Sequence, residues 1–283
     1  MSGLLRAPSC AVAVSLLLVP AAAHAGEPST QPALVLAADG GVMARTLSWK
    51  DDIFGLLRDY TLPGAPSFGG EVAVYPGAFF TRGRLAWLGI AARGEGIVGA
   101  SSMRNGHTDA LPTHASAFSA SLRGRLPLPF GAAWLDAGVA EHSFTIGQAG
   151  ITSPDFPSVD YLGPRLGLAA ELRLPRGLTV APRVGVARWT SAGEVASAAW
   201  FPHAIAWGVD AGVRVAWASR GAMGPEHSRA ARGFAPYLDL AWSRDVLALR
   251  PQLGDALVAG GLADDRVWAR LGLEWSLAGA PPH

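Results

Sequence analysis

The chain has 283 residues, and its 23 basic and 22 acidic side chains leave a formal net charge of +1, which gives no case for a nucleic-acid partner. Charged residues make up 16% of the chain, against about 25% in an average soluble domain, and the mean hydropathy is +0.25. Beyond the N-terminal segment, no apolar run reaches the ~18 residues that a transmembrane helix requires.

The N-terminal segment predicts a secretory signal peptide. A basic region ends at Arg6, an apolar stretch covers Ala11 to Val19, and a small-x-small cleavage motif ends at Ala25. The only cysteine, Cys10, precedes the apolar stretch, so the pattern does not fit a lipid anchor. Cleavage would remove this cysteine, and the mature chain would then contain no disulfide, no thiol nucleophile and no thiolate metal site.

The rest of the chain alternates between apolar and polar residues with a period of two, which is typical of β-strands. About ten strands are expected, and no helix pattern of comparable strength occurs. In chain order, the expected strands are Gly41–Trp49, Gly70–Phe80, Arg84–Glu95, His114–Leu126, Ala132–Ile146, Val159–Leu174, Leu178–Thr190, His203–Ala218, Phe234–Asp245 and Arg266–Leu277.

Short and long connections alternate along this series of strands. The short ones carry Pro or Gly where hairpins favour them, and they are Thr81–Gly83, Pro127–Gly131 and Pro175–Gly177. The long ones include Lys50–Gly69, Gly96–Thr113, Gly147–Ser158 and Val246–Asp265. Ser219–Gly233 breaks the alternation, because it is long and polar where a short turn is expected.

The two faces of each expected strand differ in polarity. In the last strand, one face reads Val267, Ala269, Leu271, Leu273 and Trp275, and the other reads Arg266, Trp268, Arg270, Gly272 and Glu274. The apolar faces continue over six or seven positions in several strands, long enough for a tilted membrane crossing of about 9–11 residues. The polar faces mix arginine, carboxylates and glycine without lysine. We therefore expect the apolar faces to contact lipid and the polar faces to line an interior.

The polar faces predict a set of lumen-lining side chains. The set comprises eight arginines and six carboxylates: Arg45, Glu71, Arg93, Arg123, Asp136, Arg165, Glu171, Arg173, Arg183, Asp210, Arg214, Asp239, Arg270 and Glu274. Glu171 and Arg183 flank one short turn on adjacent strands, so they are expected to be near neighbours. The last strand is expected to pair with the first near Val42 to Trp49, and Trp268 is expected to point inward.

Tryptophans near the strand ends predict two aromatic girdles of the kind found at bilayer interfaces. The expected members are Trp49, Trp189 and Trp242 at the long-loop end, and Trp134, Trp217 and Trp275 at the short-turn end.

The signal segment, the alternating strands and the asymmetry of turns and loops resemble the outer-membrane β-barrel proteins of Gram-negative bacteria. The resemblance implies a transmembrane, antiparallel, up-and-down barrel of about ten strands in one all-β domain. Lipopolysaccharide, membrane lipid and the barrel-assembly machinery would be its partners. Such proteins usually end on an aromatic residue, whereas here Trp275 is followed by Ser276 to His283. The expected divisions are a signal peptide (1–25), a short N-terminal lead (26–40), the barrel (41–277) and a tail (278–283).

For the function, we expect a non-catalytic barrel with a structural, transport or binding role. An interior only slightly wider than one that side chains fill would be held by ion pairs. The alternatives are a narrow passive channel, a lipid A-modifying enzyme and a soluble periplasmic β-protein. The oligomeric state is left open, and no cofactor is expected.

The enzyme alternative rests on His114 and Ser116, two positions apart on one strand face, a spacing similar to the His-x-Ser of lipid A deacylases. That family's asparagine after the serine is replaced by Ala117, and Glu141 is the candidate orienting acid.

A protease similar to omptins would need paired acids near the outer rim. Asp51-Asp52 and Asp264-Asp265 are acidic pairs, both expected in long loops. No His cluster has the spacing of metal ligands.

Overall fold

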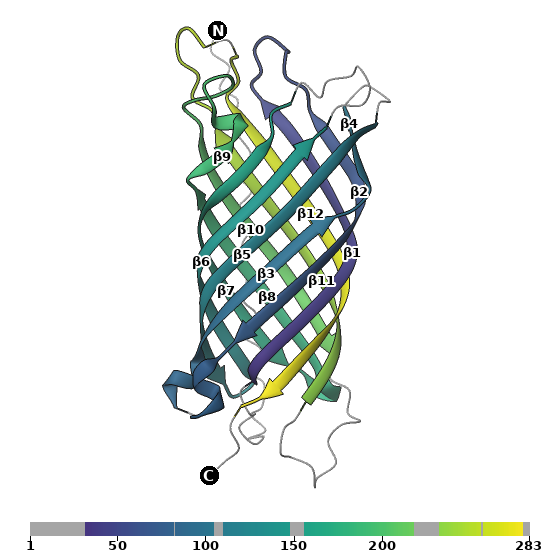
Figure 1. Ribbon diagram of the computed structural model, residues 1–283, viewed down its shortest axis with the longest axis vertical. Coiled ribbons are helices and arrows are strands. Elements are labelled where there is room, and N and C mark those ends of the chain that lie inside the picture. Colours follow the sequence, from purple (N-terminus) through teal and green to yellow (C-terminus); the bar gives the residue numbers. More distant parts are fainter. Residues whose placement is uncertain are drawn as a thin grey trace, which may run out of the picture.

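The structure, a computed structural model, describes residues 32–81, 83–104, 110–147, 156–217, 232–255 and 257–279. These residues form one closed antiparallel β-barrel (Figure 1). The strands are β1 (Pro32–Lys50), β2 (Tyr60–Val74), β3 (Leu88–Ile97), β4 (Ala100–Arg104), β5 (Ala110–Leu128), β6 (Gly131–Ile146), β7 (Val159–Arg173), β8 (Leu178–Trp189), β9 (Ser191–Gly193), β10 (Ile205–Trp217), β11 (Arg232–Ala248) and β12 (Gly261–Ala278). The short 3-10 turns are η1 (Pro76–Phe79), η2 (Arg84–Trp87), η3 (Pro175–Gly177) and η4 (Glu194–Ala196).

Two of the barrel strands are interrupted, which reconciles twelve segments with a ten-strand barrel. After a break at residues 98–99, β4 continues the line of β3 and pairs with β2 and β5. After Thr190, β9 continues the line of β8 and pairs with β7. The expected number of strands, about ten, is therefore confirmed. No helix among the described residues is long and apolar enough to cross a membrane.

The barrel closes between the first and last strands. β1 pairs with β12, where Val42 lies opposite Ala269 and Trp49 opposite Leu262. The other edge of β1 pairs with β2. The predicted pairing of the last strand with the first is thus confirmed, and every long strand has two neighbours.

Two expected strand starts were wrong near the N-terminus. β1 begins at Pro32, so the expected lead of residues 26–40 is largely strand. β2 begins at Tyr60, so the first long loop covers only residues 51–59. Pro63 and Gly64 are unusual inside a strand, so the start of β2 was placed too late in the sequence. In the structure they lie at a register shift opposite β1, where a strand tolerates proline.

The connection after β2 is also longer than expected. Residues 75–87 contain η1 and η2 in place of strand ends and a tight Thr81–Gly83 turn. Pro76 opens η1 and has no N–H to donate to a sheet ladder. The two connections at residues 129–130 and 174–177 are short, as predicted. The signal segment, residues 219–231 of the long polar connection and the last four residues lie outside the described part.

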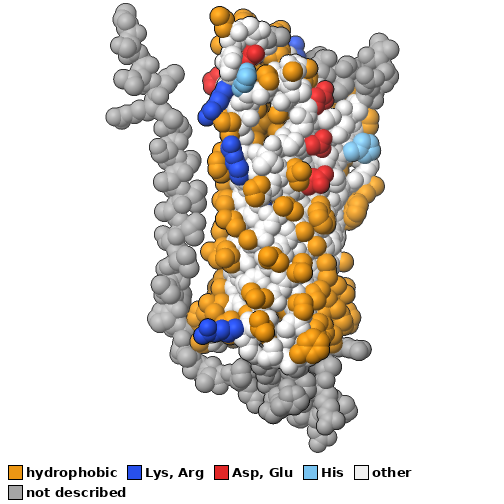
Figure 2. All heavy atoms as spheres, turned by 60° about the vertical axis from the view of Figure 1, so that its left-hand side comes forward, with side chains coloured by type: hydrophobic (Ala, Val, Ile, Leu, Met, Phe, Trp, Pro, Cys, Tyr) orange, Lys and Arg blue, Asp and Glu red, His pale blue; other side chains and the backbone are white. Residues whose placement is uncertain are grey.

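Alternate residues of each strand point outward, and the outward face is apolar. Leu271 is 69% exposed and Leu273 is 58% exposed on β12, and Leu166 and Leu168 are similarly exposed on β7. Figure 2 shows apolar side chains over the lower half of one face, while the visible acidic side chains lie in its upper half. The apolar face of β12 therefore points away from the barrel interior and packs against no second sheet within the described residues.

Candidate functional site

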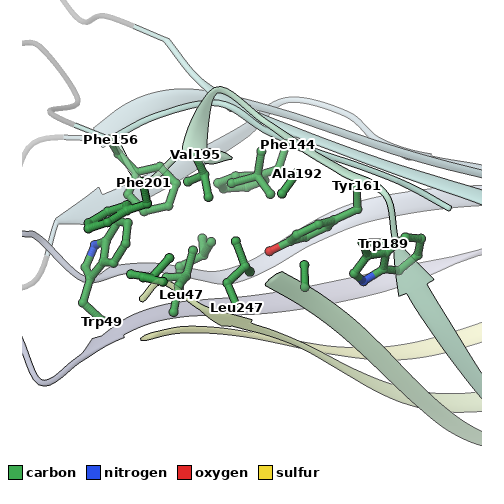
Figure 3. Close-up of a cluster of buried hydrophobic side chains, with 14 of the residues drawn as sticks. Leu47, Trp49, Phe144, Phe156, Tyr161, Trp189, Ala192, Val195, Phe201 and Leu247 are labelled. Carbon is green, nitrogen blue, oxygen red and sulfur yellow. The ribbon is translucent and has the colours of Figure 1, made fainter. Parts of the chain in front are cut away.

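The interior at the long-loop end is filled by an apolar cluster, here called the outer plug (Figure 3). Its larger buried members are Leu47, Trp49, Tyr60, Leu111, Phe144, Ile146, Phe156, Val159, Tyr161, Trp189, Val195, Phe201, Leu247, Leu249 and Leu262. Strand ends supply most of these side chains, and the connections before β7, β10 and β12 supply the rest. The plug is thus partly made of loop segments folded into the barrel.

Aromatic rings pack closely in the plug. The ring centroid of Trp49 lies 5.4 Å from that of Phe201 and 5.7 Å from that of Phe156. Phe156 also makes an edge contact with Tyr60 at 5.3 Å. Such separations are typical of favourable ring pairs in a packed core, so this level of the lumen is apolar and densely filled.

A charged layer lies directly beneath the plug. Arg266 on β12 forms an ion pair with Asp245 on β11, and its Nη2 lies 2.9 Å from Nδ1 of His142. The Trp189 indole donates a hydrogen bond of 2.8 Å to the same aspartate. His142 is on β6, five strands from β12 in the ten-strand ring. This layer therefore connects opposite walls of the barrel.

A second pair at this level joins neighbouring strands. Arg45 donates from Nε to Asp264 Oδ1 at 2.8 Å, and both side chains are fully buried. The guanidinium carbon of Arg45 also lies 3.8 Å from the ring centroid of Phe144. The pair is thus shielded from water by the plug above it.

The middle of the lumen contains further ion pairs between strands that are not adjacent. Arg270 donates to Glu95 at 2.7 Å, and Arg93 donates to Asp39 at 2.9 Å. Arg183 donates two hydrogen bonds to Asp239, at 2.6 and 3.0 Å. Arginine has donors in a planar fork that matches a carboxylate, so these bonds restrict both partners.

Glu71 is the centre of the network nearer the short-turn end. Arg123 and Arg214 each donate to this carboxylate at 3.1 Å, and they come from β5 and β10. Arg123 also makes two hydrogen bonds with Asp136, at 2.7 and 3.0 Å. The Arg214–Glu71 bond crosses between strands four places apart in the ring.

A cavity of about 400 Å³ remains between these side chains in the middle and lower lumen. Its charged lining includes Glu71, Arg93, Arg123, Asp136, Arg165, Glu171, Arg183, Asp210, Arg214, Arg270 and Glu274. The plug aromatics Trp49, Phe156 and Phe201 do not contribute to this lining. The interior therefore combines a polar cavity with an apolar closure at the long-loop end.

The structure places the sequence-predicted lumen residues as follows. Arg45 and Asp239 are buried in ion pairs, and eleven others line the cavity. Arg173 lies at the short-turn end, where its side chain is 43% exposed and pairs with Glu171. Glu171 and Arg183 are diagonal neighbours across the β7–β8 ladder, as predicted, because Leu172 is opposite Val180 and Ala169 is opposite Arg183. The Arg183 guanidinium nevertheless pairs with Asp239, two strands away.

Sequence reasoning missed several interior charges. They are Asp39, Glu95, Arg125, His142, Asp245 and Asp264. Strand parity could have found most of them, because Asp264 and Arg266 alternate in step with Arg270. Asp264 and Asp265 were expected in a loop, so strand parity was not applied to them; both residues lie in β12.

Three of the six expected girdle tryptophans point inward, and this part of the prediction was wrong. Trp49 and Trp189 are buried in the plug, and Trp134 lines the cavity. The reason is parity: each lies an even number of positions from an inward arginine or aspartate of its own strand. The remaining three, Trp217, Trp242 and Trp275, lie on the outward face, together with Trp207, which is 56% exposed.

The candidate enzyme residues lie outside the barrel. His114 and Ser116 are exposed on the outward face of β5. Ser116 pairs with Ser143 of β6, and Glu141 pairs with Phe118, on the side of the serine away from the histidine. An orienting acid must contact the histidine, and this register places Glu141 beyond the serine instead.

The acidic residues considered for a protease site each bind a different partner. Asp52 accepts hydrogen bonds from the backbone of its own loop, at Gly55 and Leu57. Asp264 is bound to Arg45, and Asp265 is bound to Arg244. The described residues contain no group of three or more His, Cys, Asp or Glu side chains that could hold a metal ion.

Comparison with known proteins identifies the fold. No protein-family model matches the chain, and no curated protein sequence matches it. Among solved structures, the outer membrane protease OmpT from Escherichia coli is similar, with 14% identity, a TM-score of 0.50, and coverage of 88% of this chain and 98% of that protein. The outer membrane protein AlkL in lipid bilayers covers 92% of this chain and 97% of its own, at 12% identity and a TM-score of 0.39. The chain has the fold of outer-membrane β-barrel proteins.

Proposed function

We propose that this chain is a non-catalytic barrel of the Gram-negative outer membrane, closed to passive diffusion, with a structural or binding role. Export would use the signal segment, cleaved after Ala25, and insertion would use the barrel-assembly machinery. The apolar outward face supports a lipid environment, because a soluble sheet with this many exposed leucines would associate or aggregate.

The outer plug carries the proposal that the lumen is closed. An apolar constriction excludes hydrated ions because they would have to lose water there. The plug closes the long-loop end, which in such barrels faces the exterior, and the Arg266–His142 contact spans the lumen beneath it. The charged cavity below would then be a blind space reached from the short-turn end.

Planar-bilayer recording tests this proposal against the narrow-channel alternative. The purified barrel is inserted at high salt, with an open porin as positive control and heat-modifiable gel migration as the check on folding. We expect insertion without unit conductance steps. Reproducible steps from the folded wild-type barrel would overturn the proposal in favour of a channel.

Two positions support the absence of catalysis. Catalysis would need Glu141 to contact the base, His114, while His114 contacts the nucleophile, Ser116. The register places Glu141 on the opposite side of Ser116 from His114, so this order is not formed. Replacing Ser116 with Ala is expected to leave the acylation of lipid A unchanged in cells that express the barrel, as judged by mass spectrometry. A loss of deacylated lipid A in the variant would favour the enzyme.

A further inference from the structure

One arginine on the outward face differs from the others in the barrel. Arg188 of β8 follows the exposed Val184 and Val186 at the same parity, so it points away from the lumen. Its guanidinium carbon lies 4.4 Å from the ring centroid of Trp207, the residue directly opposite on β10. A cation is attracted to the face of an indole ring, so the contact holds the guanidinium against the outside of the barrel.

Arg188 also lacks an anionic partner within the described residues. The other strand arginines with described side chains each lie within 4.0 Å of a carboxylate. An unpaired arginine on a lipid-facing surface is unfavourable at the bilayer midplane, and this cost becomes small near the interface. The position therefore fits an interface that supplies an anion.

A second arginine lies close by on the same outward face. Arg244 of β11 is opposite Val209 of β10, is 48% exposed, and donates two hydrogen bonds to Asp265. Only β10 lies between Arg188 and Arg244, and their partners on β10 are two residues apart. Two strand spacings of about 4.8 Å and two residue rises of about 3.4 Å therefore separate their backbones by about 12 Å. The guanidinium groups of Arg188 and Arg244 thus lie on either side of β10, at the long-loop end of its exposed apolar residues.

We propose that Arg188, Trp207, Arg244 and Trp242 form a docking site for the phosphorylated disaccharide head of lipid A in the outer leaflet. Guanidinium groups bind phosphate oxygens through paired N–H donors, and two such groups suit a head that carries two phosphates. The acyl chains would lie on the apolar face below. This inference rests on the outer-membrane location proposed above.

Charge complementarity selects this sector of the barrel. On the far side of Arg188, the outward faces of β6 and β7 carry the exposed carboxylates Glu141 and Asp160, which repel phosphate. The head group is therefore expected to bind over β8, β10 and β11 and not around the whole circumference.

Binding of hexa-acyl, bisphosphorylated lipid A to the full barrel in detergent, measured by native mass spectrometry, tests the site. We expect Arg188→Gln to weaken binding about 10-fold or more, because charged hydrogen bonds are lost. Asp265→Asn is expected to tighten binding, because it frees Arg244 from its carboxylate. Arg84→Gln, which removes an exposed arginine at the short-turn end, is the matched control and should leave binding unchanged.

Phosphatidylglycerol and monophosphoryl lipid A complete the experiment. Both should bind more weakly than bisphosphorylated lipid A. Equal affinity for phosphatidylglycerol, or unchanged lipid A binding by Arg188→Gln, would overturn the site. Failure of the wild-type barrel to insert into lipid vesicles would instead contradict the proposed membrane function, so the two outcomes are distinguishable.

Discussion

Two adjacent aspartates provide a matched test of the inward and outward faces of β12. Asp264 and Asp265 each bind one arginine through both carboxylate oxygens. The Arg45–Asp264 side chains are 2% and 0% exposed, whereas the Arg244–Asp265 side chains are 48% and 26% exposed. Chemistry and strand position are nearly the same, and burial is the main difference between the pairs.

Replacing Asp264 with Asn leaves the positive charge of Arg45 buried without its counter-ion, which costs about 3–5 kcal/mol of unfolding free energy. Asn in place of Asp265 breaks an exposed pair, which is worth about 0–1 kcal/mol. The Phe144 ring, 3.8 Å from the Arg45 guanidinium carbon, still attracts the cation in the Asp264→Asn variant, so we expect a loss nearer to about 3 kcal/mol than to about 5 kcal/mol. Equilibrium urea unfolding in detergent micelles, followed by gel mobility and circular dichroism, measures both values.

The double variant Arg45→Met/Asp264→Leu supplies the control. Replacing a buried ion pair by apolar residues of similar volume is often nearly neutral, so this variant should recover most of the stability that Asp264→Asn loses. Equal destabilisation by Asp264→Asn and Asp265→Asn would refute the assignment of Asp264 to the barrel interior.

Two further predictions concern the plug and the lipid face. Trp189→Phe keeps an aromatic side chain but removes the indole donor to Asp245 Oδ1. Arg266 still pairs with the other carboxylate oxygen, and the loss of the donor to Oδ1 should lower the unfolding free energy by about 1–3 kcal/mol in the same urea assay. Leu271→Lys places a charge on the exposed apolar face of β12 and should cost about 2–4 kcal/mol in lipid bilayers; an unchanged stability in lipid vesicles would show that this face does not contact the membrane interior.

Much of the fold followed from the sequence because strand parity is a local property. The alternation of Arg270 and Glu274 with Leu271 and Leu273 separated the two faces of β12 before any contact was known. The strand boundaries were harder to predict where proline interrupts the alternating pattern, as at Pro63 and Pro76. A local sequence does not reveal whether a neighbouring strand accommodates a register shift.

Parity alone could have corrected the girdle tryptophans. Trp49 shares the face of Arg45, and Trp189 shares the face of Arg183. Their positions near strand ends suggested an interface, but position along a strand and direction across the sheet are independent. The direction decides whether an indole contacts lipid or packs inside the barrel.

The sequence by itself determined that this chain forms an antiparallel barrel of about ten strands with an arginine- and carboxylate-rich interior. Only the tertiary structure decided which charges meet, because an arginine side chain inside a closed barrel can reach strands far from its own in sequence. Arg183 contacts Asp239 instead of Glu171 for this reason. Closure also decided that loop residues such as Phe156 and Phe201 fill the long-loop end, since their packing depends on the curvature that brings opposite walls together.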